Sequence, residues 1–96
     1  MSLIRGPVRV EVFYLPGSPA CNRTFAWLEA HGTPHRRTNP DETERHWLKL
    51  IGCPAVFPTV IVWTGDRYHR VRHLTIHGHN ENLLAKAHEL ATKENP

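Results

Sequence analysis

The chain has 96 residues, 40% of them hydrophobic, and a formal net charge of +3. This length predicts one domain over residues 1–96 with one modest core. Its 12 lysines and arginines are spread along the sequence, so we expect no nucleic-acid partner, which would require a clustered basic face.

No apolar run approaches the roughly 20 residues of a membrane-spanning helix, and the N-terminus lacks the apolar stretch of a signal peptide. Two cysteines, Cys21 and Cys53, are too few for a secreted disulfide framework and fit a reducing compartment. We therefore expect a cytoplasmic protein with no membrane partner.

The first predicted element is a strand over residues 8–15, where valines at 8, 10 and 12 alternate with more polar residues. Pro16-Gly17 ends this strand. Ser18 before Pro19 is typical of a helix start, and Gly32 ends that helix. The apolar face of the helix consists of Cys21, Phe25 and Leu28.

The next residues, 34–38, are predicted to form a short polar strand. Asn39 is predicted to cap a second helix, with Pro40 at its first position and Glu42 as the acidic residue of the first turn. The apolar face of this helix consists of Trp47, Leu48 and Ile51.

A β-branched run over residues 59–63 predicts a buried strand. Turn residues at 64–67 and a strand over 68–76 complete a hairpin. Asn80 then caps the last helix, which frays from residue 93. The apolar positions of that helix are Leu83, Leu84, Ala87, Leu90 and Ala91.

The predicted order βαβαββα indicates an α/β fold with one right-handed crossover, followed by an antiparallel hairpin. Three motifs accompany this order: residues 16–21 (Pro-Gly-Ser-Pro-Ala-Cys), 57–60 (Phe-Pro-Thr-Val) and 76–80 (Ile-His-Gly-His-Asn). With these motifs the chain resembles the glutaredoxins, a branch of the thioredoxin fold, over residues 8–91. The resemblance implies a four-stranded mixed sheet with helices on both faces.

The resemblance also implies thiol–disulfide oxidoreductase chemistry, with a thiol or protein disulfide as substrate. In the family, the first cysteine of a Cys-x-x-Cys pair attacks a mixed disulfide and the second resolves the product; here Ser18 stands at the first position and Cys21 at the second. Pro58 corresponds to the family's cis-proline, which leaves the backbone of Phe57 to pair with substrate. Because a serine hydroxyl without an adjacent base is a poor nucleophile, we expect weak or absent dithiol activity.

Three interpretations of Ser18 stay open. Its side chain caps the helix by accepting from the Cys21 amide, it replaces a natural cysteine, or it donates a hydrogen bond to the thiolate of bound glutathione, as in serine-type glutathione transferases. Cys21 is either a small buried hydrophobe or a lone reactive thiol. Cys53 is either an inert loop thiol or a partner for Cys21 under oxidation.

No cofactor is expected apart from glutathione or another low-molecular-weight thiol as ligand. The resemblance implies that the Gly78 amide and Asn80 would meet the γ-glutamyl carboxylate. Two family contacts are absent, because Leu15 replaces a lysine and His77 replaces a glycine. Positive charge to offset these losses could come from Arg23, Arg36 and Arg37, if these side chains are not simply solvated.

The histidines do not predict a metal site. His69, His73 and His77 share one face of a predicted edge strand, but ligands four residues apart on a strand are about 13 Å apart. His77 and His79 are the only close pair. We interpret the face as a charged edge that resists strand pairing.

The leading functional hypothesis is a glutaredoxin-like protein whose nucleophile position holds serine. The alternatives are a non-catalytic module that binds a peptide or a thiol tripeptide, and a serine-type glutathione-binding protein.

Overall fold

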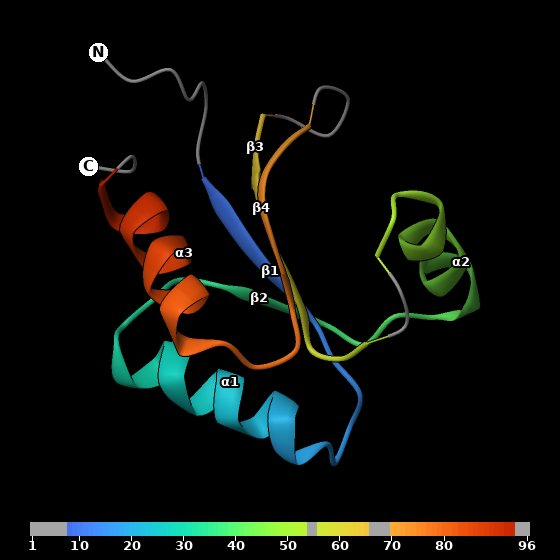
Figure 1. Cartoon of the computed structure of the whole chain (residues 1–96), viewed down its shortest axis with the longest axis horizontal. Helices are drawn as coiled ribbons and strands as arrows, with labels where there is room; N and C mark the ends of the chain where they lie inside the picture. Colours follow the sequence, from blue (N-terminus) through green and yellow to red (C-terminus); the bar gives the residue numbers. More distant parts are fainter. Residues whose placement is uncertain (1–7, 54–55, 66–69, 94–96) are drawn as a thin grey trace.

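A computed structural model describes residues 8–53, 56–65 and 70–93 of the chain. Within them the elements follow the predicted order of strands and helices (Figure 1). Their bounds are β1 (Arg9–Phe13), α1 (Pro19–Ala30), β2 (Arg36–Thr38), α2 (Glu42–Leu50), β3 (Thr59–Thr64), β4 (Val71–His77) and α3 (Glu81–Lys93).

The four described strands form one mixed sheet in the order β2-β1-β3-β4. β1 is parallel to β2 and antiparallel to β3, and β3 pairs antiparallel with β4. The α/β class and the four-stranded mixed sheet predicted from the sequence are therefore confirmed.

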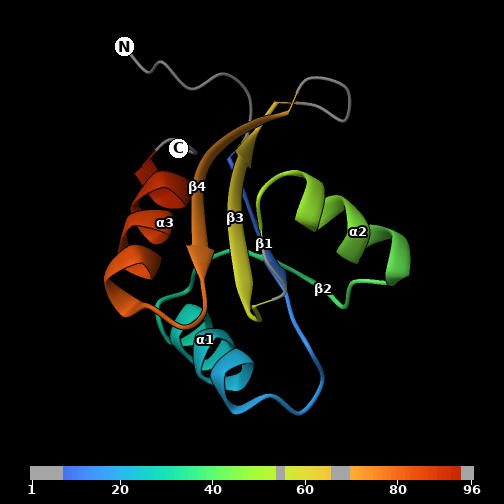
Figure 2. The same ribbon diagram turned by 45° about the vertical axis from the view of Figure 1, so that its right-hand side comes forward.

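Helices cover both faces of the sheet, because side chains alternate along each strand and both faces carry apolar residues. α1 and α3 lie side by side on one face, and α2 lies on the other (Figures 1 and 2). The core beneath α1 and α3 includes Val10, Val12, Leu28, Val60, Val62, Ile76 and Leu84. The core beneath α2 consists of Phe13, Leu48, Cys53, Ile61 and Trp63, with Trp47, Ile51 and Phe57 packed against it.

β1 ends at Phe13, two residues before the predicted end of the strand. The Tyr14 amide still donates to the Thr38 carbonyl at 3.0 Å. Beyond it, Gly17 adopts φ = +78°, a conformation that glycine reaches without steric cost, and the chain turns into α1.

The predicted cap of α2 is wrong by two residues, since Asp41 and not Asn39 caps the helix. The Glu44 amide donates to the Asp41 carboxylate at 2.8 Å, and the Asp41 amide donates to the Glu44 carboxylate at 3.2 Å. Asn39 and Asp41 are each followed by a glutamate three residues on, but the Asp41 carboxylate interacts better than the Asn39 amide with the positive end of a helix.

The hairpin also differs from its prediction. β3 continues through Thr64, predicted as a turn residue, because all six of its residues are buried between the two layers of helices. β4 spans Val71–His77 and contains a bulge opposite Val62 and Trp63. Residues 66–69, with His69 among them, lie outside the described residues. None of the described helices is both long and apolar enough to cross a membrane.

Candidate functional site

Three segments that are distant in sequence meet at one end of the sheet. Phe13 pairs with Thr59 across β1 and β3, and Thr59 pairs with His77 across β3 and β4. The segment after β1, the segment before β3 and the segment after β4 therefore lie at the same end. A hydrogen bond of 2.8 Å from the Gly78 amide to the Pro58 carbonyl joins the last two segments.

Ser18 caps α1 in the manner predicted. It adopts an extended conformation (φ −73°, ψ 122°) before Pro19, and its side-chain oxygen accepts from the Cys21 amide at 3.4 Å. The Cys21 side chain is fully buried and its thiol is free. At the start of α1 the Ser18 hydroxyl is therefore only partly buried, whereas the Cys21 thiol is fully buried.

The loop before β3 is shaped by its proline. The Phe57–Pro58 peptide bond is cis, the configuration expected from the sequence. Pro58 is buried, whereas Phe57 packs half-buried against the α2-side core. The Thr59 hydroxyl donates to the Val56 carbonyl at 2.6 Å. This bond joins the residues on either side of Phe57 and Pro58 and so stabilises the loop.

The turn before α3 corrects one expected contact. Gly78, at φ = +78°, donates its amide hydrogen to Pro58, so this N–H is already used and does not face a ligand carboxylate. Asn80 caps α3 as predicted, since its side-chain oxygen accepts from the Leu83 amide at 3.1 Å. The NH2 group of Asn80 is not used in this cap and can donate to a ligand.

A contact between α1 and this turn was not predicted. The buried Thr24 hydroxyl lies 2.9 Å from Nδ1 of His79, and Nε2 of His79 lies 3.8 Å from the Glu81 carboxylate. The only signal in the sequence was a threonine on the buried face of a helix. The bond ties the turn that carries Asn80 to the helix that carries Ser18.

We expect Thr24→Val to lower the melting temperature by roughly 4–8 °C, because a lost buried hydrogen bond costs about 1 kcal/mol in a domain of this size. Thermal unfolding followed by circular dichroism measures the change. Thr43→Val is the matched control, since Thr43 is exposed in α2 and its replacement should have little effect. Equal melting temperatures for the two variants would show that the Thr24–His79 bond does not stabilise the turn.

The two cysteines are not brought together. Cys21 lies in α1 on one face of the sheet, and Cys53 lies in the core under α2 on the opposite face. Cys53 is buried, and the Arg72 guanidinium donates to its sulfur at 3.6 Å and to the Ile51 carbonyl at 3.1 Å. The interpretation of Cys53 as a disulfide partner for Cys21 is therefore wrong for this structure.

The remaining candidates lie apart from this site or contribute little to it. The Arg37 guanidinium pairs with Glu29, and Arg36 lies on β2, away from the loops described above. His73 is the extra residue of the bulge in β4, and its Nε2 lies 2.5 Å from the Thr64 hydroxyl. The prediction that His73 and His77 share one face of this strand is therefore wrong. No group of three or more metal-ligating side chains occurs among the residues described here.

Comparisons with protein-family models, with curated proteins and with solved structures yield no match for this chain.

Proposed function

We propose that the chain is a glutaredoxin-like protein of the thioredoxin fold, which binds a thiol compound such as glutathione and does not catalyse dithiol exchange. The proposal is supported by the sheet order with helices on both faces. It is also supported by the three motifs that meet at one end of that sheet.

The arrangement of Ser18 and Cys21 carries the proposal. The Ser18 oxygen accepts from the Cys21 amide, which leaves the hydroxyl hydrogen available for donation. A ligand thiolate held there would also lie near the positive end of α1, which favours a negative charge. With the Cys21 side chain fully buried, no second thiol faces the bound ligand to release it.

Two further groups would orient the ligand. The Phe57 backbone next to Pro58 offers an extended edge for pairing with a peptide-like ligand. The NH2 group of Asn80 offers a donor to a carboxylate, because only the oxygen of that side chain is used in capping α3. A tripeptide with one thiol and free carboxylates has the groups that these contacts require.

Titration of the ¹⁵N-labelled chain with reduced glutathione tests the proposal. We expect saturable shifts of amide resonances confined to residues 14–18, 57 and 78–80. Ser18→Ala should weaken binding by about tenfold or more, because a hydrogen bond to a charged group is lost. Ser18→Thr, which keeps both the hydroxyl and the cap, should bind nearly as well as the parent chain.

S-methylglutathione is the control ligand, since its sulfur does not form a thiolate. We expect it to bind the parent chain more weakly than glutathione and to be insensitive to Ser18→Ala. The proposal fails if glutathione produces no saturable shift up to about 10 mM, or if Ser18→Ala and Ser18→Thr bind it equally.

A further inference from the structure

A cavity lies at the opposite end of β1 from Ser18. It has a volume of about 330 Å³ and is lined by residues 8–11, 34–36, 63, 65 and 70. The strand pairing accounts for this set, because Glu11 pairs with Arg36 across β1 and β2 and Arg9 pairs with Trp63 across β1 and β3. The volume is in the range of small-molecule pockets.

The charged groups of this cavity are predominantly positive. Arg9, Arg36 and Arg70 are exposed, and Glu11 is the single carboxylate of the lining. Both oxygens of Glu11 are engaged, one by the Thr38 hydroxyl at 2.9 Å and the other by the Trp63 indole N–H at 3.2 Å. The Glu11 carboxylate is thus hydrogen-bonded within the sheet, and the lining sets three guanidinium groups against this one carboxylate, an excess of two positive groups.

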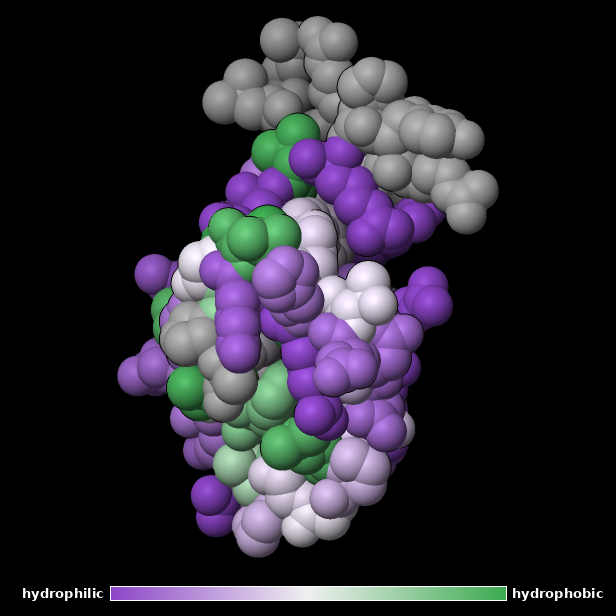
Figure 3. All heavy atoms as spheres, turned by 90° about the vertical axis from the view of Figure 1, so that its right-hand side faces the viewer, coloured by the Kyte–Doolittle hydropathy of each residue, from purple (hydrophilic) through white to green (hydrophobic). Residues whose placement is uncertain are grey.

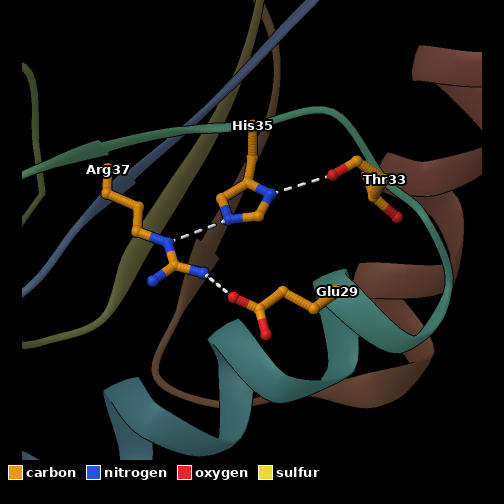
Figure 4. Close-up of polar contacts among 4 residues, drawn as sticks. All are labelled: Glu29, Thr33, His35 and Arg37. Carbon is orange, nitrogen blue, oxygen red and sulfur yellow. Dashed lines mark hydrogen bonds and ion pairs between the residues drawn. The ribbon is translucent and has the colours of Figure 1, made fainter.

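Neighbouring arginines on β2 have different surroundings. Arg37 faces α1, where it pairs with Glu29 and donates to Nε2 of His35 at 3.1 Å (Figure 4). Arg36 points to the other face of β2, and within the described residues neither it nor Arg9 has a side-chain hydrogen bond or ion pair. Exposed guanidinium groups of this kind can bind an oxyanion through two parallel hydrogen bonds.

The wall of the cavity at β3 is aromatic. Trp63 lies in the lining, and the Arg70 guanidinium carbon is 5.8 Å from the centre of its ring. On the face of the molecule seen in Figure 3, hydrophilic side chains are interspersed with hydrophobic patches. In the cavity, the Trp63 indole is the apolar ring placed beside the three arginines. An aromatic wall favours a flat apolar group in a ligand.

We propose that this cavity binds a small organic anion in which a flat apolar ring carries one phosphate or carboxylate group. The arginines bind the oxyanion, and the ring lies against Trp63. Because the cavity lies at the other end of β1, this binding is independent of the thiol-binding function proposed above.

Titration of the ¹⁵N-labelled full chain with phenyl phosphate, and separately with benzoate, tests this site. We expect saturable shifts of the Glu11, Arg36 and Gly65 amides with at least one of the two probes, and weaker binding of both phenol and inorganic phosphate. Arg36→Gln should raise the dissociation constant about tenfold or more. Arg23→Gln makes the same charge change at an exposed position on α1 and should leave the constant unchanged.

The ratio between phenyl phosphate and benzoate identifies which oxyanion the arginines prefer. Three results would overturn the proposal: no saturable shift with either probe, equal effects of Arg36→Gln and Arg23→Gln, or inorganic phosphate binding as tightly as phenyl phosphate. Ser18→Ala should not change the affinity for phenyl phosphate, so a failure of the thiol site is distinguished from a failure of this one.

Discussion

Ser18→Cys is expected to raise the rate of reduction of a glutathione mixed disulfide by roughly a hundredfold or more over the parent chain. The new thiolate would stand at the N-terminus of α1, where unpaired amides and the helix dipole favour its charge. It would attack the glutathione sulfur of the substrate and release the substrate thiolate. Free glutathione would then resolve the resulting mixed disulfide by the same exchange.

The assay couples formation of glutathione disulfide, the product of the resolving step, to its reduction by a reductase. It compares four chains: the parent, Ser18→Cys, Ser18→Ala, and Ser18→Cys combined with Cys21→Ala. We expect turnover only in the two chains with the Ser18→Cys change, since the Cys21 side chain is buried and is not needed when external glutathione resolves the intermediate. Turnover by the parent would mean that Cys21 is reached by substrate. If none of the chains turned over, the losses at Leu15 and His77 would outweigh the missing nucleophile.

Leu84→Ala is expected to cause the largest loss of stability among single substitutions considered for this chain. Leu84 is fully buried in α3 and belongs to the core formed with α1 and the sheet. Its truncation should lower the free energy of unfolding by about 2–5 kcal/mol, because apolar burial is lost and a cavity remains. In a domain of this size that corresponds to a fall in melting temperature of roughly 10–25 °C.

Leu50→Ala is the matched control, because Leu50 is also a helical leucine but is 73% exposed. Its replacement should change the free energy of unfolding by less than about 0.5 kcal/mol. Denaturant unfolding of both variants measures the difference. A loss below about 1 kcal/mol for Leu84→Ala would contradict the packing of α3 on the sheet.

Local features of the candidate site followed directly from short-range patterns. Ser18 and Asn80 cap helices as predicted, because a cap depends on a few neighbouring residues and on hydrogen bonds that close within one turn. At the start of α2 the local pattern predicted Asn39 as the cap, whereas Asp41 caps the helix. The stronger interaction of a carboxylate with the positive helix end accounts for this difference.

Short-range sequence patterns did not predict the contacts between segments that are distant in sequence. The expected role of the Gly78 amide was wrong because Pro58, 20 positions earlier in the sequence, supplies the acceptor once β3 and β4 have paired. The bulge at His73 likewise shifted a histidine out of its expected alternation. Neither feature has a signature within one element.

The sequence by itself determined the order of the elements, the α/β class and the positions of Ser18 and Cys21 at the start of α1, because hydrophobic periodicity and capping act over a few residues. Tertiary structure alone decided that Thr24 meets His79, that Cys21 and Cys53 lie on opposite faces of the sheet, and that three scattered arginines line one cavity. Those placements depend on which strands pair and in which register. The register of a strand is set by how well its whole buried face packs against the core. That packing cannot be deduced from a short stretch of sequence.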